Sequence, residues 1–477
     1  MSEEHSNGVR SCLVAGEPVV SQSSLKVCNP YTGKLVGEVK TASREDLERA
    51  IALGVDYQCS LTRYERSQIL SKTAEIIAER REIFARGITD ETGLCMRESR
   101  YEVGRALDVL SFAAIAALED DGDIYSCDIS PNGKQRKIYT LREPLNIVAA
   151  ITPFNHPLNT VIHKLAPAIA VGSPVILKPS EKTPLTSFRL ADALYEAGLP
   201  KPMLSVLLGP TSDISEPLVT DKRVDLVSFT GSVAVGKRIS ETAGYKKLVL
   251  ELGGNDPLIV LANGDLDLAV KLACEGAFRN SGQRCTAVKR ILVEESIVEA
   301  FTERMLAKVG EYPAGDPYDE DTRVGTVIDE ASAIYLETVV NEASQAGARV
   351  LVGGKRRGAL MEPTILDRVP RDARMIVHES FGPLAPIVAV KDLDDAIAVA
   401  NSTDYGLSSG VVTESLPDAI KAIKSLRTGT VNINEVPGYR IEKSPFGGIK
   451  DSGLGIKEGV IEAMKCMTTV KTYSLPW

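Results

Sequence analysis

The sequence has no long apolar run, which separates it from membrane-spanning chains. No stretch approaches the roughly 18 consecutive apolar residues that a membrane span requires. Residues 1–10 are polar and lack the apolar centre of a secretory signal. We therefore expect a protein of the reducing cytoplasm that has no membrane partner.

An excess of positive charge is also missing. Lys and Arg total 55 against 64 Asp and Glu, which gives a net charge of −9. This balance argues against nucleic acid or an anionic membrane as the main partner. An anionic ligand must then be bound by a local group of basic residues.

Closely spaced cysteine pairs are absent as well. The chain has eight scattered cysteines: Cys12, Cys28, Cys59, Cys95, Cys127, Cys274, Cys285 and Cys466. No two of them have the CxxC spacing that a zinc or redox site uses. We expect no metal site, and we expect most of the thiols to be reduced and buried.

The composition is that of an ordinary globular protein. Hydrophobic residues make up 44% and charged residues 25% of 477 residues, with 38 Gly and 25 Pro. At roughly 150 residues per domain this length suggests about three structural units. Internal repeats and low-complexity linkers are absent from the sequence.

Short apolar runs alternate with helical patterns from about residue 145 onward. The first series of runs covers 147–152, 174–178, 204–208, 225–230 and 248–252, with a helix predicted over 186–197. A second series predicts strands at 290–294, 349–352, 385–390, 409–413 and 429–434, and helices at 297–309 and 394–400. Alternating buried strands and helices are typical of parallel sheets. The pattern predicts an α/β protein with a doubly wound, Rossmann-like nucleotide-binding domain and a second α/β domain.

Two further regions flank these series. Helical patterns at 45–53, 67–92 and 102–117 precede the first one, and polar strand-like segments lie at 123–139 and 468–475. Exposed strand edges favour pairing with another chain. We assign 1–122 and 141–252 to the nucleotide-binding domain, 253–445 to the second, catalytic domain, and 123–140 with 468–477 to a small β oligomerisation arm.

Three residues have the character of a reactive site. Cys285 follows a Gly-containing bend and adjoins Arg284, whose charge lowers a thiol pKa. Glu251 and Asn155 each end a predicted strand, where ligand sites of open α/β sheets lie. Asn155 offers a side-chain N–H to an oxyanion. Each has an ordinary structural alternative: a buried cysteine, a helix cap or surface acid, and a turn asparagine.

Seven motifs in one order give these residues a common context. They are Pro-Phe-Asn at 153–155, Lys-Pro-Ser-Glu at 178–181, Phe-Thr-Gly-Ser at 229–232, Glu-Leu-Gly-Gly-Asn at 251–255, Gly-Gln-Arg-Cys at 282–285, Glu-Ser-Phe-Gly-Pro at 379–383 and Pro-Phe-Gly-Gly-Ile-Lys at 445–450. Over nearly the whole chain the sequence resembles the NAD(P)-dependent aldehyde dehydrogenase superfamily. It departs from many members at Phe154, where they have Trp, but the aromatic ring is kept.

The resemblance implies oxidation of an aldehyde through a covalent intermediate. Cys285 would be the nucleophile, Asn155 and the Cys285 backbone N–H would hold the oxyanion, and Glu251 would be the base for hydrolysis. A catalytically silent cofactor-binding protein of the same fold is the alternative from another class. The three intact residues argue against it.

The resemblance also implies a cofactor site and a homo-oligomer, a dimer or a tetramer. Ser232 would meet the pyrophosphate at a helix N-terminus, Lys178 and Glu181 the adenosine ribose, and Glu379 the nicotinamide ribose. A carboxylate beside the ribose favours NAD, with NADP as the weaker alternative. The expected cofactor set is completed by Thr152, Phe154, Gly231, Gly253 and Phe381.

Basic residues near the nucleophile point to a small anionic aldehyde as substrate. We expect Arg105, His156, Arg284 and Arg440 to form a pocket for a dianionic head group. Salt bridges elsewhere are the alternative for each arginine. Within the family the combination resembles the members that oxidise phosphonoacetaldehyde in 2-aminoethylphosphonate breakdown, with the non-phosphorylating glyceraldehyde-3-phosphate dehydrogenases as the alternative.

Overall fold

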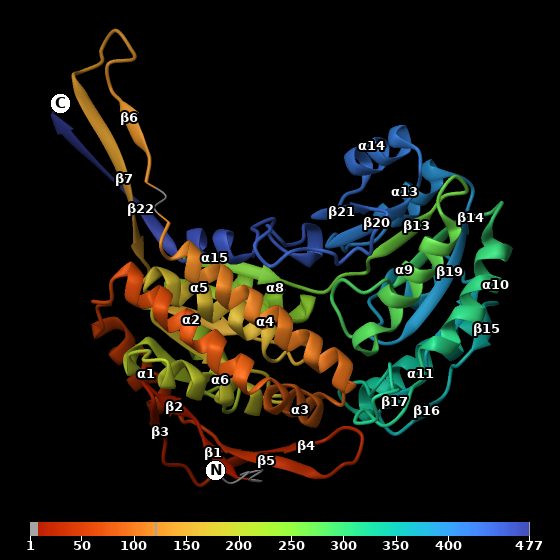
Figure 1. The fold of residues 1–477 in the computed structure, drawn as a ribbon, viewed down its shortest axis with the longest axis horizontal. Coiled ribbons are helices and arrows are strands. Elements are labelled where there is room, and N and C mark those ends of the chain that lie inside the picture. The colour runs from red at the N-terminus through yellow and green to blue at the C-terminus, as the bar shows by residue number, and fades with distance from the viewer. Residues whose placement is uncertain (1–7, 120–121, 477) are drawn as a thin grey trace.

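The computed structural model describes residues 8–119 and 122–476. Residues 1–7, most of the polar amino-terminal stretch assessed above, lie outside the described residues. Two seven-stranded sheets with helices around them form the body, and a thin β arm extends from it (Figure 1). The predicted α/β fold class is confirmed.

The first sheet is the predicted doubly wound one. Its strands, side by side, are β12 (Lys247–Glu251), β11 (Leu226–Thr230), β8 (Val148–Ile151), β9 (Val175–Lys178), β10 (Leu204–Val206), β2 (Leu13–Val14) and β3 (Glu17–Pro18). The first five are parallel, and each lies within two residues of a predicted run. The strand order reverses at β8, so a ligand crevice is expected between the carboxyl ends of β8 and β11.

Helices cover both faces of this sheet. They are α1 (Arg44–Asp56), α2 (Arg63–Glu79), α3 (Arg81–Thr92), α4 (Met96–Ala116), α5 (Asn159–Val171), α6 (Leu185–Glu196), α7 (Ser215–Thr220) and α8 (Val233–Thr242). The single helix expected over 67–92 is wrong, because the backbone leaves the α-helical region at Arg80 (φ −105°, ψ 24°) and a new helix begins at Arg81.

The second sheet forms the other half of the body. Its order is β15 (Arg349–Val352), β18 (Thr364–Asp367), β19 (Leu384–Val390), β14 (Arg290–Glu294), β13 (Pro257–Val260), β20 (Ser408–Val412) and β21 (Thr430–Ile433). Its helices are α9 (Leu266–Phe278), α10 (Val298–Lys308), α11 (Glu330–Gln345), α12 (Arg374–Val377), α13 (Leu393–Asn401) and α14 (Leu416–Ser425). Strand β15 is antiparallel to β18, and the remaining pairs are parallel. Strands β13 and β18 were not predicted.

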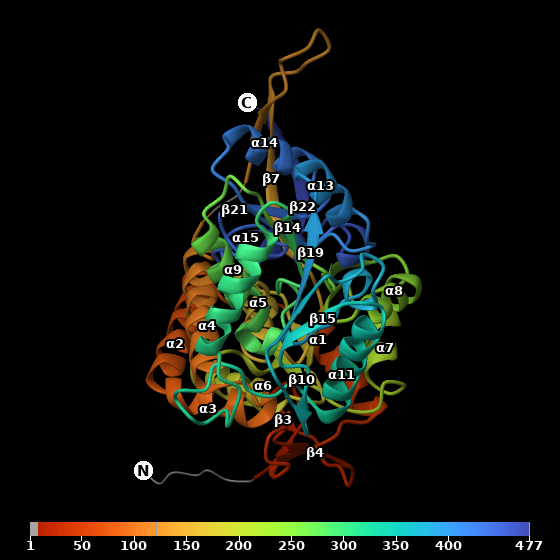
Figure 2. The ribbon, with the colours of Figure 1, turned by 90° about the vertical axis from the view of Figure 1, so that its right-hand side faces the viewer.

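Three smaller sheets complete the fold. The strands β1 (Val9–Ser11), β5 (Leu35–Lys40) and β4 (Ser24–Cys28) form one, and β16 (Arg356–Arg357) pairs with β17 (Leu360–Met361). The arm consists of β22 (Thr468–Pro476), β7 (Arg136–Pro144) and β6 (Ile124–Ser126), all antiparallel. It projects beyond the body in both views (Figures 1 and 2), and its edge strands are β22 and β6. Pairing with another subunit stays a prediction.

The chain returns to the first unit before it enters the arm. Helix α15 (Val460–Cys466) places Val460, Ala463 and Met467 in the core that also contains the inner faces of α4 and α5. The segment 446–467 has no place in the predicted domains; its residues 460–467 pack into the first unit, while Ile449, Lys450 and Ser452 contact the second.

The structure bears on two expectations, the absence of a membrane span and the burial of the cysteines. Over residues 8–119 and 122–476, no helix is both long and apolar enough to cross a membrane. The expected burial of most cysteines is wrong: all eight are free thiols, but Cys12, Cys95 and Cys274 alone are buried, while Cys28 is exposed.

Candidate active site

A cavity of about 580 Å³ lies at the carboxyl ends of β8, β11 and β12, and the second unit lines it with the loops before β14 and β19 and the loop after β21. Thirteen of the sixteen predicted site residues line it: Arg105, Phe154, Asn155, His156, Gly231, Ser232, Glu251, Gly253, Arg284, Cys285, Glu379, Phe381 and Arg440. They come from segments as distant in sequence as α4 and the loop after β21. The structure therefore brings the candidate nucleophile, base, oxyanion amide and basic residues to one place.

A left-handed turn precedes Cys285. Asn280, Ser281 and Gly282 all have positive φ, at 56°, 52° and 69°. A Cβ at Gly282 would lie 2.1 Å from the Gly382 carbonyl oxygen, so only glycine fits there. Left-handed non-glycine residues cost of order 1–3 kcal/mol each and persist where the surroundings hold them. The turn brings Cys285 to the cavity wall.

The expected effect of Arg284 on the Cys285 thiol is wrong. The Arg284 guanidinium donates to the Glu275 and Gly276 carbonyls in the last turn of α9, at 3.0 and 2.8 Å. Burial raises the pKa of Cys285 to about 11, and the cation that most opposes this shift is Lys289. Free carbonyls at a helix carboxyl terminus attract a guanidinium, which explains where Arg284 binds.

Asn155 is tied to the loop that carries the candidate nucleophile. Its Nδ2 donates to the Gln283 carbonyl at 2.8 Å, and Asn280 Nδ2 donates to the Asn155 carbonyl at 3.3 Å. These bonds join the end of β8 to the turn before Cys285. The amide is therefore held close to the sulfur's own loop.

Glu251 ends β12 and is almost completely buried, with 3% of its surface exposed. Neither of its side-chain oxygens has a hydrogen-bond partner among the described residues. Burial and the nearby Glu458 carboxylate raise the pKa of Glu251 well above its ordinary value. Glu458 itself accepts a hydrogen bond from Lys164 at 2.7 Å, and neither of these two residues was predicted.

On the cofactor side of the cavity, the start of helix α8 lies near a carboxylate, Glu379, that is packed against Gly253. Ser232 caps α8 by accepting the Val235 N–H. A Cβ at Gly253 would lie 2.2 Å from Glu379 Oε2, so a larger residue there would displace this carboxylate. Phe154 and Phe381 pack edge to face with ring centroids 5.8 Å apart. An anion-binding helix terminus, a carboxylate and two rings suit a dinucleotide.

Lys289 was not predicted, although it connects this side to the nucleophile. Its Nζ donates to Glu379 Oε1 at 2.7 Å and to the Cys285 and Gly254 carbonyls at 2.6 Å each. The side chain is 3% exposed. A buried ammonium group paired in this way fixes three segments relative to one another.

Three predicted cofactor residues lie outside the cavity lining. Thr152 follows β8, whereas Lys178 ends β9 and pairs with Glu181, the Nζ–Oε1 distance being 3.2 Å. Because β8 and β9 are neighbours, these residues extend the same sheet edge beyond the cavity.

The basic part of the cavity is organised around one unpredicted carboxylate, Glu442. Its oxygens lie 2.5 Å from Arg105 Nε and 2.5 Å from His163 Nε2, with Arg440 Nη2 at 3.8 Å. Burial opposes the Glu442 charge, but the His163 hydrogen bond and the Arg105 charge hold its pKa well below the ordinary value. The salt-bridge alternative thus applies to Arg105 and, at the longer distance, to Arg440, although both line the cavity.

Arg279, Arg284 and Arg440 add positive charge to the cavity. Burial lowers the pKa of Arg284 to about 10, with Arg279 adding repulsion. Arg279 itself pairs with both oxygens of Glu98, at 2.9 and 3.1 Å. Arg440 stacks over the Phe446 ring at 3.8 Å from its centroid. The cavity therefore contains several guanidinium groups, and contacts with other residues of the protein fix the orientation of several of them.

Comparison with known proteins gives this site a family. A model described as the aldehyde dehydrogenase family matches residues 19–473. The chain is 39% identical over 456 residues to 3-sulfolactaldehyde dehydrogenase of Priestia aryabhattai, covering 95% of each chain. It resembles the structure of aldehyde dehydrogenase 21 from Physcomitrella patens in complex with the reaction product succinate (TM-score 0.95, 35% identity, 98% of each chain). It also resembles glyceraldehyde-3-phosphate dehydrogenase GapN from Methanocaldococcus jannaschii complexed with NADP (TM-score 0.92, 37% identity, 96% of this chain and all of that chain).

The fold and the cavity define an oxidoreductase of two α/β units with a dinucleotide cofactor. The chain belongs to the aldehyde dehydrogenase family, whose members oxidise aldehydes with NAD or NADP.

Some of the missed residues had a readable signal. His163 and Lys164 are consecutive polar residues in α5, an otherwise apolar and buried helix. Polar groups in such a helix need buried partners, and these are Glu442 and Glu458. The glutamates themselves lie in loop sequence with no periodicity, and nothing in the sequence marks them.

Proposed function

We propose that this aldehyde dehydrogenase oxidises a small anionic aldehyde, phosphonoacetaldehyde, to its carboxylate, phosphonoacetate. The observation that supports this proposal is the placement of Arg105, His156, Arg284 and Arg440 on the same cavity as Cys285. An uncharged aldehyde makes no use of this many basic groups, whereas a dianionic phosphonate binds them by charge-assisted hydrogen bonds.

The chemistry begins at Cys285. Its thiolate attacks the aldehyde carbon and forms the C–S bond of a thiohemiacetal, while the carbonyl π electrons move to oxygen. The side-chain amide of Asn155 and the backbone N–H of Cys285 stabilise the resulting oxyanion. Because burial raises the pKa of the resting thiol, its proton must leave before attack, and Lys289 is the cation that favours this ionisation most.

Two steps complete the turnover. The cofactor, held by Ser232 and Glu379, would supply the hydride acceptor through which the thiohemiacetal on Cys285 becomes a thioester. Glu251 then takes a proton from water, whose oxygen attacks the thioester carbon, and the C–S bond breaks to release the thiolate and the carboxylic acid, which loses its remaining proton to solvent. The unpartnered, buried carboxyl of Glu251 suits a group whose partner is a transient water.

For the cofactor we propose NAD, with NADP as the weaker alternative. Ser232 and Gly231 would hold the pyrophosphate, Glu379 the nicotinamide ribose, and Lys178 with Glu181 the adenosine ribose, while Thr152, Phe154, Gly253 and Phe381 complete the site. The Glu181 carboxylate disfavours a 2′-phosphate. Its ion pair with Lys178 reduces this effect, so the preference is modest.

Two other anionic aldehydes are close competitors. The similarity to a 3-sulfolactaldehyde dehydrogenase and to GapN favours a sulfonate or a phosphate ester as the head group. Phosphonoacetaldehyde has the shortest distance between aldehyde and anion of the three. His156 directly follows Asn155 and lines the same cavity as Cys285, which favours the short substrate.

Initial rates of NADH formation over a panel of aldehydes test the proposal. The panel contains phosphonoacetaldehyde, glyceraldehyde 3-phosphate, 3-sulfolactaldehyde, succinic semialdehyde and acetaldehyde, each with NAD and NADP. Phosphonoacetaldehyde should have the highest kcat/KM. A higher value for another anion would reassign the substrate, and an equal value for acetaldehyde would remove the anion pocket from the proposal.

We further propose that the protein is a cytoplasmic homo-oligomer, a dimer or a tetramer, assembled through its arm. The edge strands β6 and β22 expose apolar side chains, among them Ile124 at 65% and Val470 at 53%. Light scattering at micromolar concentration should show more than one copy. A chain truncated after Lys471 should dissociate more readily, and a monomeric full-length protein would contradict the proposal.

A further inference from the structure

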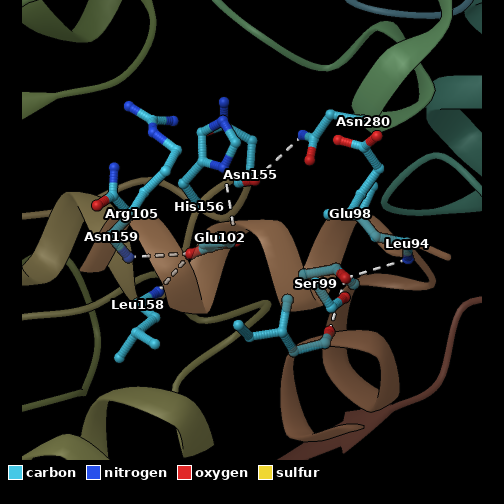
Figure 3. A network of polar contacts seen from close by, with 12 residues as sticks. Leu94, Glu98, Ser99, Glu102, Arg105, Asn155, His156, Leu158, Asn159 and Asn280 are labelled. Carbon is cyan, nitrogen blue, oxygen red and sulfur yellow. Dashed lines mark hydrogen bonds and ion pairs between the residues drawn. The ribbon is translucent and has the colours of Figure 1, made fainter. Parts of the chain in front are cut away.

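A buried carboxylate on α4, Glu102, lies beneath the loop that carries Asn155 and His156. Its exposed fraction is 1%, and its Oε1 accepts the backbone N–H groups of Leu158 and Asn159 at 2.8 and 2.9 Å (Figure 3). These N–H groups belong to the start of α5, where free donors favour an anion. One oxygen of Glu102 thus caps a helix.

The other oxygen of Glu102 faces an imidazole. Glu102 Oε2 lies 3.5 Å from His156 Nδ1, and Figure 3 shows the two side chains pointing toward each other. Both atoms are buried, and within the described part of the chain neither has a hydrogen-bond partner. Leaving a buried charged acceptor without a hydrogen bond costs more than leaving a neutral one without a partner. The group placed to satisfy it is an Nδ1–H of His156.

Several arginines line the same cavity as His156. Arg105 follows Glu102 by one helical turn of α4, and Arg284 and Arg440 line the same cavity. Glu442 balances Arg105 and Arg440, but it is bound on both oxygens. Glu102 is therefore the carboxylate that faces His156.

We propose that Glu102 is a positioning residue for the anion pocket: it holds the His156 ring at Nδ1, so that Nε2 is turned toward the substrate's anionic head group beside Asn155. This inference rests on the proposed function and names the group that makes His156 part of the pocket. With Nδ1 facing Glu102, Nε2 is the ring nitrogen left for an anion, and it donates a hydrogen bond when the ring carries both protons. Glu102 touches no reacting atom, and its effect is exerted through His156.

The chain contains a matched control in Glu91. This residue is also buried and also caps a helix, accepting the backbone N–H groups of Leu185 and Thr186 at the start of α6. Its second oxygen additionally accepts the Thr186 hydroxyl, and it lies outside the cavity lining. Glu91→Gln therefore reports the effect of neutralising a buried helix cap without an imidazole partner.

The test uses inorganic phosphate as the anion, so that it does not depend on which aldehyde is the substrate. Inhibition of acetaldehyde oxidation by phosphate gives a Ki for the wild-type protein and for Glu102→Gln, His156→Asn and the double variant. We expect about a tenfold rise in Ki for each single variant, from the loss of one charge-assisted contact. The double variant should resemble His156→Asn, because Glu102 acts through that ring.

Further readouts separate this role from a structural one. With phosphonoacetaldehyde, Glu102→Gln should raise KM and leave kcat within about twofold, whereas Glu91→Gln should lower the melting temperature and leave the phosphate Ki unchanged. Glu102→Asp keeps the charge and should retain most phosphate binding. This variant also tests the role of Glu102 if Glu102→Gln does not fold.

Three results would overturn the inference. They are additive effects of Glu102→Gln and His156→Asn, an equal rise in Ki for Glu91→Gln, and a wild-type protein that phosphate does not inhibit. If phosphonoacetaldehyde is not oxidised but the phosphate Ki values of the single and double variants are as expected, the proposed substrate is wrong and the role of Glu102 stands.

Discussion

The polar groups at the two ends of the cavity differ in whether they have hydrogen-bond or ion-pair partners. At the end with Cys285 and Glu251, the carboxylate has no hydrogen-bond partner among the described residues and burial raises the pKa of both groups. At the other end, Arg105 and His163 are bound by Glu442, whose pKa is held low. The reacting groups are left free to change protonation, while the recognising groups are fixed in charge and position.

This difference has an energetic side. Unpaired buried polar groups cost about 1–3 kcal/mol each and are tolerated where chemistry needs them. Fixed cations, in contrast, need no reorganisation when an anion binds. Substitutions at the two ends should therefore separate cleanly into effects on turnover and effects on substrate selection or stability.

Removing the nucleophile should have the largest effect. Cys285→Ala should lower hydride transfer to less than about one part in a thousand, because no other group forms the covalent intermediate. Cofactor binding, measured by fluorescence titration, should be unchanged. Residual NADH formation above that level would assign the nucleophile elsewhere.

Glu251→Gln should stop the reaction one step later. A burst of NADH equal to the enzyme concentration should precede a steady state slowed by about 10²–10⁴-fold, since only hydrolysis needs the base. In the wild type the raised pKa keeps Glu251 protonated at lower pH, so steady-state turnover should increase as pH rises through that pKa. Stopped-flow records over a pH series check both points, and a variant without a burst would contradict the role.

Glu442→Ala should act on stability more than on chemistry. Removing one partner of a buried ion pair typically costs about 3–5 kcal/mol. Because the folded-state pKa of Glu442 is lowered, its contribution is present above the ordinary glutamate pKa and is lost as pH falls through the lowered value. The difference in melting temperature between wild type and variant should therefore be largest near neutral pH and should shrink in acid. A constant difference would show that packing dominates.

The smallest effect is expected from single basic residues, and it should be selective. Arg105→Ala or Arg440→Ala should cost about 1.5–3 kcal/mol, roughly tenfold or more in kcat/KM, for phosphonoacetaldehyde. Acetaldehyde has no head group and should be affected little. Equal losses for both substrates would mean that these arginines support the fold only. Arg284 is a poorer probe, because its guanidinium binds the end of α9.

The sequence predicted most of what depends on local pattern. Strands β8 and β12 are short apolar runs because they are buried in the sheet, and residues at their ends are brought together by parallel pairing. In contrast, β2 and β3 have two residues each, too few for periodicity. The break at Arg80 has no glycine or proline to mark it.

Long-range partners were beyond such prediction. Glu442 pairs with Arg105 across 337 residues, and Glu102 meets the start of α5 across 56. Charge in the sequence indicates that a partner is needed but not which one. The Arg284 error has the same origin, since proximity in sequence to Cys285 did not reveal the competing carbonyls of α9.

The contacts of α4 set how a molecule reaches the cavity. Arg105 binds Glu442 and Glu98 binds Arg279, so one helix is fastened at two points to loops of the opposite half. A motion that separates the two halves would break the Arg105–Glu442 and Glu98–Arg279 ion pairs, and both carboxylates would lose these partners in a medium of low dielectric constant. We therefore expect substrate and product to enter and leave the cavity by diffusion, without an opening motion of the two halves.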